Sequence, residues 1–170
     1  DSSYRSLTSE DLKLHETESF TTMAGQDTAC LPIYASRVVE YRPGLKINEV
    51  PIEPPHEIPE NALGIPDEPA TPNYVSLGYR SSEEYPGFII LEIDALHHNY
   101  TVASIKIVET SLGNYDCSTQ SPTIRLSVSE DGVTWQPLAD MCQTQTYTLP
   151  TPLTFRYLKI QDISLPGLFP

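Results

Sequence analysis

The 170-residue sequence lacks the features on which membrane insertion and most known enzymatic chemistry depend. No apolar run approaches the roughly 18 residues that a membrane-spanning helix needs. The sequence also has no GxSxG, HExxH, P-loop or paired-glycine phosphate cradle, each of which marks a particular catalytic geometry. Its three cysteines show neither CxxC spacing nor a histidine at ligand spacing, which argues against zinc. We therefore expect no membrane insertion and no enzymatic activity.

Basic residues are scarce, with 10 against 23 acidic residues and a net charge of −13. Such a field repels phosphate backbones, so nucleic acid is not an expected partner. Glycine is scarce as well, with eight residues against 16 prolines, and this ratio favours extended and turning segments over helix. The chain opens at Asp1 without an initiator methionine, as a processed product does. We expect a removed signal peptide and an extracellular or cell-surface location.

Short β-rich segments separated by turns run through most of the sequence. In residues 127–138 (SVSEDGVTWQPL), polar and apolar residues alternate up to an Asp131-Gly132 turn, after which Trp135 follows. This pattern predicts a β-hairpin whose tryptophan lies in the core. Further strands are expected at 31–41, 74–78, 88–93, 101–109, 123–129 and within 155–164. About eight short strands with almost no helix predict an all-β sandwich.

Two segments depart from the strand pattern. Residues 1–30 are polar and rich in Ser, Thr and Glu, and we expect an N-terminal arm or linker there, followed by a sandwich domain at 31–170. Residues 46–72 hold seven prolines and show little periodicity. A loop of this length in a compact domain is usually functional or fixed by other contacts.

The three cysteines cannot all pair within one chain. Cys117 and Cys142 flank the predicted hairpin and could bridge neighbouring strands or loops, closing a loop of about 25 residues that typically stabilises a fold by about 3 kcal/mol. Cys30 would then be left over, either free and buried or bonded to another molecule.

Seven short segments follow one another in an order that resembles a group of bacterial cell-surface or secreted β-sandwich modules. These modules are related to the discoidin (F5/8 type C) and galactose-binding-like jelly rolls. The segments are 34–44 (YASRVVEYRPG), 61–67 (NALGIPD), 73–78 (NYVSLG), 88–93 (FIILEI), 105–117 (IKIVETSLGNYDC), 127–135 (SVSEDGVTW) and 155–164 (FRYLKIQDIS). The resemblance covers about residues 33–165. It implies an extracellular, non-catalytic jelly roll with a calcium ion beside the early loop.

The resemblance also implies which residues would hold that calcium. The backbone carbonyl groups around Leu63 and Ile65 and the carboxylate of Asp67 are the first candidates, since calcium takes six to eight hard oxygen ligands. Glu109 and Asp116 are secondary candidates. Asp67 as a plain turn former, and Glu109 as a strand-end carboxylate bonded to a loop, remain the alternatives.

The sequence departs from its apparent relatives in two places. Residues 81–86 (SSEEYP) stand where relatives carry a glycine-rich turn, and the chain ends at Pro170 where relatives run on into an acidic segment and a final strand. We expect the sandwich either to be cut short or to take its last strand from another molecule. An open sheet edge would invite such strand addition.

Aromatic and imidazole side chains in the predicted loops are the candidate ligand-binding residues. A tyrosine ring can stack on a sugar face or anchor a protein interface, and the alternative is that these rings cap the ends of the core. The candidates are Tyr79, Tyr85, His97, His98, Tyr100 and Tyr115. For the two histidines, a plain surface position is the alternative to a site.

Two functions from different classes follow from these features. In the first, the chain is a non-catalytic extracellular module that binds a glycan or another cell-surface component, with calcium holding the long loop. In the second, it is a structural subunit of an extracellular filament or surface layer. It would then self-assemble through its N-terminal arm, Cys30 and its open sheet edge.

Overall fold

The computed structural model describes nine short strands and the segments that join most of them. The described residues are 32–46, 48–66, 73–79, 81–93, 101–108, 123–142 and 145–164, together with the paired two-residue strands β1 (Ser19–Phe20) and β2 (Ala29–Cys30). The rest of the predicted N-terminal arm lies outside the described residues. Within the described part, no helix is long and apolar enough to cross a membrane.

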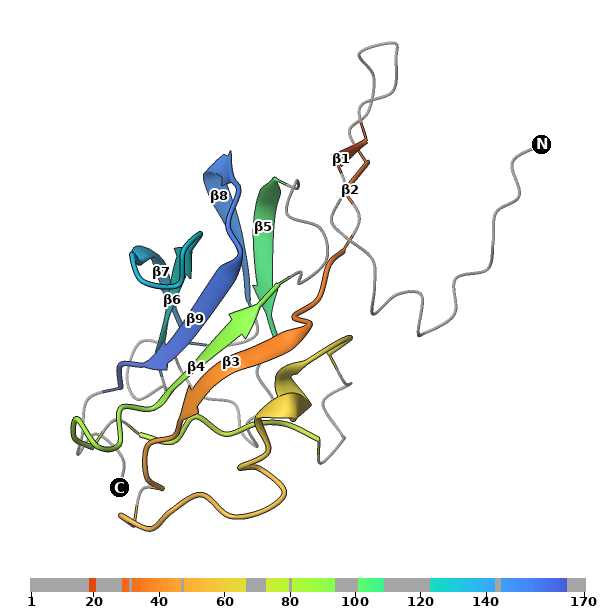
Figure 1. The fold of residues 1–170 in the computed structure, drawn as a ribbon. Coiled ribbons are helices and arrows are strands. Elements are labelled where there is room, and N and C mark those ends of the chain that lie inside the picture. The colour runs from red at the N-terminus through yellow and green to blue at the C-terminus, as the bar shows by residue number, and fades with distance from the viewer. Residues whose placement is uncertain are drawn as a thin grey trace.

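The larger of the two main sheets has five strands, and every neighbouring pair in it is antiparallel (Figure 1). The order across the sheet is β3 (Arg37–Arg42), β4 (Phe88–Glu92), β9 (Tyr157–Asp162), β6 (Ile124–Ser129) and β7 (Gln136–Met141). Strands β6 and β7 are the predicted hairpin, whose turn contains Asp131 and Gly132. That prediction is confirmed.

A second sheet pairs β5 (Val102–Ile107) with β8 (Gln145–Leu153) in antiparallel fashion. Side chains of both sheets meet in one core, in which Val102, Ile105 and Leu149 of the small sheet pack with Leu126 and other residues of the large one. The predicted all-β sandwich is thereby confirmed. Residues 88–92, expected in the core from their apolar run, are all buried.

Two strand predictions differ from the structure. Residues 74–78 form no strand. Ser76 N donates to His56 O, whereas Leu77 O accepts from Gly44 N. Because these hydrogen bonds go to two different segments, no ladder forms. Strand β8 was not expected, since it contains Pro150 and Pro152. Both prolines lie between Thr148 and Leu153, where the register with β5 shifts. Proline is tolerated at such an irregularity because the ladder needs no N–H donor there.

The prediction of a core tryptophan is wrong. Trp135 is only half-buried, precedes β7 and is absent from the core cluster. Its ring lies near Lys159 Nζ, 5.9 Å from the ring centroid, and Lys159 lies on the side of the sheet away from the core. The pattern of alternating residues predicted the hairpin correctly. Trp135, however, belongs to the turn, where alternation no longer determines to which side of the sheet a side chain points.

The proline-rich loop is held by contacts with the segments that precede and follow it in the chain. It contains the short 3-10 helix η1 (Pro59–Ala62), which lies beside β3 (Figure 1). Asn61 Nδ2 donates to the backbone oxygens of Pro55 and Tyr74, at 3.1 and 3.4 Å. The rings of His56 and Tyr74 stack with centroids 3.8 Å apart. Its described part is therefore fixed to segment 73–79, which agrees with the expectation that so long a loop is fixed or functional.

Candidate functional site

The five-stranded sheet presents three rows of side chains on the side that faces away from β5 and β8. In antiparallel strands, residues directly opposite each other point to the same side of the sheet. The pairing gives Arg37, Glu92, Tyr157 and Ser129 in the first row; Glu40, Ile90, Lys159, Ser127 and Pro137 in the second; Arg42, Phe88, Gln161, Arg125 and Asp140 in the third. We call this surface, with the adjoining Trp135 and Arg156, the outer face.

Lys159 lies at the middle of the outer face between two aromatic rings. Its Nζ atom is 4.5 Å from the centroid of the buried Phe88 ring and 5.9 Å from that of the half-buried Trp135 ring. An ammonium group this close to an aromatic face is attracted by the ring quadrupole. Burial lowers the pKa of Lys159, and the attraction of Glu40 only partly offsets this effect. The centre of the face thus holds a partly desolvated cation.

The first row contains a buried carboxylate held by two arginines. Arg37 Nε donates to Glu92 Oε2 at 2.6 Å, and Arg156 Nε donates to Glu92 Oε1 at 2.7 Å. The guanidinium of Arg156 also lies over the ring of Tyr157, 5.3 Å from its centroid. Glu92 is not among the site residues expected from the sequence. The available signal was an acidic residue inside an apolar run, which indicates a carboxylate with partners.

The turn of the β6–β7 hairpin fixes the position of Trp135 relative to the sheet. Asp131 Oδ1 accepts hydrogen bonds from the backbone N–H groups of Val133 at 2.8 Å and Thr134 at 2.7 Å, and from Ser129 Oγ at 2.9 Å. Hydrogen bonds from the Thr134 and Val133 backbone hold the pKa of Asp131 well below its usual range. The turn directly before Trp135 is therefore tied to the end of β6.

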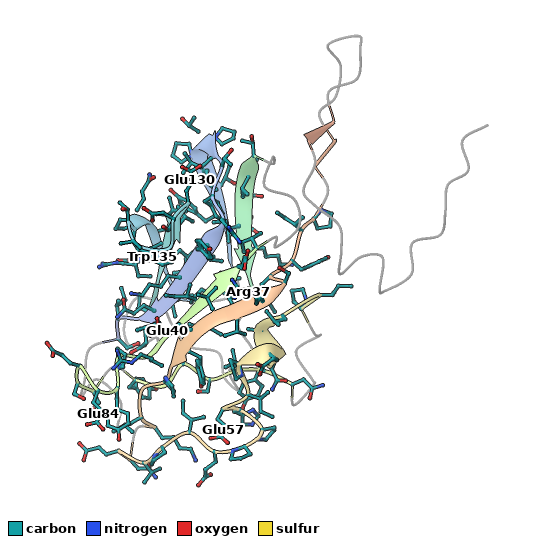
Figure 2. The ribbon with its side chains drawn as sticks, viewed as in Figure 1. Arg37, Glu40, Glu57, Glu84, Glu130 and Trp135 are labelled. Carbon is teal, nitrogen blue, oxygen red and sulfur yellow. The ribbon has the colours of Figure 1, made fainter. Side chains whose placement is uncertain are left out.

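Positive charge gathers on the outer face although the whole chain is strongly acidic. Arg37, Arg42, Arg125, Arg156 and Lys159 make up half of the ten basic residues of the chain. Among the described residues that make up the face, the acidic ones are Glu40, Glu92 and Asp140. Figure 2 shows Trp135 at the β6–β7 side of the sheet and Arg37 at the β3 side, whereas Glu57 and Glu84 lie in loops beyond the strands. The face thus carries two net positive charges.

The structure brings several of the predicted site residues together, but not on the outer face. A cavity of about 580 Å³ lies between the inner side of the large sheet, β5 and the loops 61–66 and 73–79. Its lining includes Leu63, Ile65, Tyr79 and Cys142. Many other lining residues, such as Leu158, belong to the core, so the cavity is continuous with the hydrophobic interior.

The other predicted residues lie elsewhere or outside the described part of the chain. Tyr85 sits in the loop before β4, where its backbone N–H donates to Ser82 Oγ at 3.3 Å. The remaining ones, outside the described residues, are Asp67, His97, His98, Tyr100, Glu109, Tyr115, Asp116 and Cys117. Cys142 is disulfide-bonded, and its pairing with Cys117 stays a prediction.

The described residues alone would not complete the expected calcium site. Among them, no group of three or more His, Cys, Asp or Glu side chains could hold a metal ion. The backbone at the expected ligands is fixed, since Leu63 N donates to Glu60 O and Gly64 N to Ala35 O. The carbonyls of Leu63 and Ile65 can supply oxygens, but a calcium shell would need Asp67 or other residues beyond the described part.

Comparisons with known proteins place the chain in no family. No protein-family model matches the sequence, and no curated protein does. Among solved structures, a glycoside hydrolase is similar over 83% of this chain, with a TM-score of 0.38 and 19% sequence identity. The matched part is 30% of that hydrolase, so the chain spans less than a third of its length.

Proposed function

We propose that this chain is a non-catalytic extracellular recognition module that binds a glycan across the outer face. The observation that carries the proposal is the arrangement of Trp135, Lys159 and Gln161 on one side of the sheet. An aromatic ring can pack against the C–H face of a sugar while amine and amide groups bond to its hydroxyls. This combination of an apolar platform with a few directed polar groups is typical of ligand sites.

The dimensions of the outer face suit an extended ligand. Neighbouring strands are about 4.8 Å apart, so the five strands span about 19 Å. A surface of this width fits a chain of several sugar units better than a single one. Lys159 and Gln161 stand on a paired strand, and Trp135 follows a turn that Asp131 ties to β6. Their positions are therefore set before the ligand arrives, and little conformational entropy is lost on binding.

The state of the carboxylates supports a role in binding without catalysis. Glu92 is buried between two arginines, and Arg125 Nε donates to Asp140 Oδ1 at 2.8 Å. For Asp140, the hydrogen bond from Arg125 lowers the pKa. Paired carboxylates with lowered pKa values are poor general acids, and glycoside hydrolysis ordinarily needs one acid and a second free carboxylate. Glu40 is the third carboxylate of the face, and by itself it does not supply the two carboxyl groups that hydrolysis ordinarily needs.

The extracellular location and the calcium ion stay part of the proposal. The disulfide at Cys142 supports an oxidising compartment, since such bonds persist mainly outside the cytosol. For calcium, the expected result is a rise in melting temperature when the ion is added and a loss of that rise in Asp67→Asn. No rise with calcium would remove the ion from the proposal while leaving the outer face unaffected.

The glycan proposal is tested by comparing two aromatic substitutions. Trp135→Ala removes a ring from the outer face, and Tyr85→Ala removes one from a loop that sequence reasoning favoured. Binding of the full chain to neutral and acidic polysaccharides is measured by calorimetry, with circular dichroism as the control for folding. We expect Trp135→Ala to weaken binding about tenfold and Tyr85→Ala to leave it unchanged. The reverse result would move the site to the loops, and no binding by the unaltered chain would contradict the proposal.

The size of the second sheet favours one alternative function. In the described part of the chain, β5 has β8 as its strand partner, and these two strands face a sheet of five. A strand from another molecule could extend this small sheet, as expected of a structural subunit that self-assembles. Light scattering after size exclusion, before and after trimming residues 1–30, tests this alternative. A monomer that does not change on trimming would contradict it.

A further inference from the structure

We infer that the ligand of the outer face is an anionic glycan, a sugar chain that carries carboxylate or sulfate groups. This inference rests on the proposed function and narrows it to a chemical class. It is carried by three observations: the segregation of charge, the state of the Lys159 ammonium, and the exposure of the arginines around it.

The outer face carries a net positive charge although the chain as a whole is strongly acidic. The whole sequence has a net charge of −13, yet the outer face holds five basic and three acidic side chains. A uniform distribution would have placed more than twice as many acidic as basic residues there. Opposite charge steers a ligand toward a surface and suppresses binding elsewhere on the molecule. For an anionic chain, the rest of this protein is repulsive and the outer face is attractive.

Lys159 supplies the central contact for an anion. Among the residues that the structure describes, none accepts a hydrogen bond from its ammonium group or forms an ion pair with it. The group can donate three hydrogen bonds, and its surroundings are the rings of Phe88 and Trp135. Near such apolar surface the effective dielectric constant is lower than in water, so its attraction for an anion is stronger.

The arginines around this centre keep part of their surface open. The Arg37 side chain is 55% exposed although its guanidinium contacts Glu92, and the Arg125 side chain is 47% exposed although it pairs with Asp140. A guanidinium has five N–H donors, and a single carboxylate uses at most two or three of them. Glu40, exposed in the same row as Lys159, is the one acidic side chain of the face whose charge no arginine in the described residues neutralises.

The experiment uses two pairs of polysaccharides that are matched except for charge. Polygalacturonate is compared with its methyl-esterified form, and a sulfated galactan with the same galactan after desulfation. Calorimetry on the full chain at low and high salt is expected to show tighter binding of one or both anionic forms, and this preference is expected to weaken as salt rises. The two pairs distinguish carboxylate from sulfate as the recognised group.

Three variants test whether the preference comes from the outer face. Lys159→Met keeps an unbranched side chain and removes the charge, so binding of the anionic form should fall about fivefold or more, and by a larger factor than binding of the neutral form. Glu40→Gln removes the opposing charge and should strengthen anionic binding. The matched control is Lys106→Met, which removes an exposed lysine from β5 on the other sheet.

The outcomes separate this inference from the proposed function. Equal binding of charged and neutral forms, with both weakened by Trp135→Ala, would overturn the anionic inference and leave glycan binding in place. An anionic preference that Lys159→Met and Lys106→Met reduce equally would also overturn it, because the cause would be overall charge. No binding of any of the four polysaccharides would contradict both proposals.

Discussion

Arg156 and Glu92 are 64 positions apart in the sequence, and Arg156 Nε donates to Glu92 Oε1 at 2.7 Å. The Glu92 side chain is 1% exposed, so the carboxylate is almost completely removed from water. Its second oxygen accepts a hydrogen bond from Arg37 Nε on β3. A single buried carboxylate at the end of β4 therefore ties the edge strand β3 and the segment before β9 to this strand.

Glu92→Gln should destabilise the fold by about 3 kcal/mol. The substitution removes the charge that compensates two arginines, and breaking a buried ion pair on one side typically costs 3–5 kcal/mol. Urea denaturation at pH 7 measures the difference in the free energy of unfolding. Glu53→Gln is the control, because Glu53 pairs with Lys46 at the surface and should change stability little. An equal effect of both substitutions would contradict the structural role of Glu92.

The stability that Glu92 contributes should be lost in acid. Burial raises the pKa of Glu92, but hydrogen bonds from Arg156 and Arg37 outweigh burial and hold it below the usual value. A carboxyl group whose pKa is lowered by folding stabilises the fold above its unfolded pKa of about 4.3, and this contribution disappears as the pH falls through the folded pKa. The difference in unfolding free energy between the unaltered chain and Glu92→Gln should therefore shrink below about pH 4. A constant difference from pH 7 to pH 3 would contradict this expectation.

Tyr41→Phe should lower stability by about 1 kcal/mol, because Tyr41 Oη donates to the backbone oxygen of Ser76 at 2.6 Å. Burial, together with the nearby charge of Glu57, raises the pKa of Tyr41 to about 12. The neutral phenol is therefore favoured by folding, and its contribution is complete below pH 10 and lost as the pH rises through about 12. Between pH 9 and pH 11.5, the unaltered chain should lose more stability in urea than Tyr41→Phe does. Parallel losses would show that folding does not raise the pKa of Tyr41.

Asp131→Ala should lower the melting temperature and loosen the hairpin turn. Asp131 accepts hydrogen bonds from two backbone N–H groups, Val133 and Thr134, and from the Thr134 hydroxyl at 3.0 Å. Asp131→Asn keeps one accepting oxygen and should lie between the alanine variant and the unaltered chain. Glu130→Ala, one position earlier and exposed, is the control. If the alanine variants at 130 and 131 melt at the same temperature, the turn does not depend on Asp131.

Gly44→Ala should destabilise the junction between β3 and the proline-rich loop. A Cβ atom at Gly44 would lie 2.0 Å from the backbone oxygen of Tyr79, so the two segments would have to move apart. Their hydrogen bonds, Gly44 N to Leu77 O at 2.7 Å and Leu45 N to Tyr79 O at 3.1 Å, would weaken. We expect a loss of about 1–3 kcal/mol in the free energy of unfolding. Proteolysis within residues 73–79 should also become faster.

Gly132→Ala is a useful comparison for Gly44→Ala. Gly132 has a φ of +77°, and an added Cβ would lie 3.4 Å from the Tyr157 ring, an ordinary contact. Its cost should be about 1 kcal/mol and should come from backbone conformation alone. If Gly44→Ala proved the milder of the two, the close approach of segments 44–45 and 77–79 would be in doubt.

Local sequence patterns predicted some elements well and misassigned others. The alternation around Asp131-Gly132 predicted the hairpin, and the apolar run 88–92 predicted a buried strand. Residues 74–78 have the composition of a strand but bond to two separate segments, so their neighbours decided their structure. Strand β8 contains two prolines and pairs with β5 nonetheless, because both prolines lie between Thr148 and Leu153, where the register of the pairing shifts.

The sequence by itself determined most of the strands, the acidic surplus and the residues that share one side of each strand. Only the tertiary structure decided that Glu40, Lys159 and Ser127 form one row, because that row joins strands β3, β9 and β6, which lie far apart in the chain. It also decided that Trp135 faces this row and not the core. The physical reason is that alternation along a strand is a local property. Which strand lies beside which, and in what register, depends on the packing of the whole sheet.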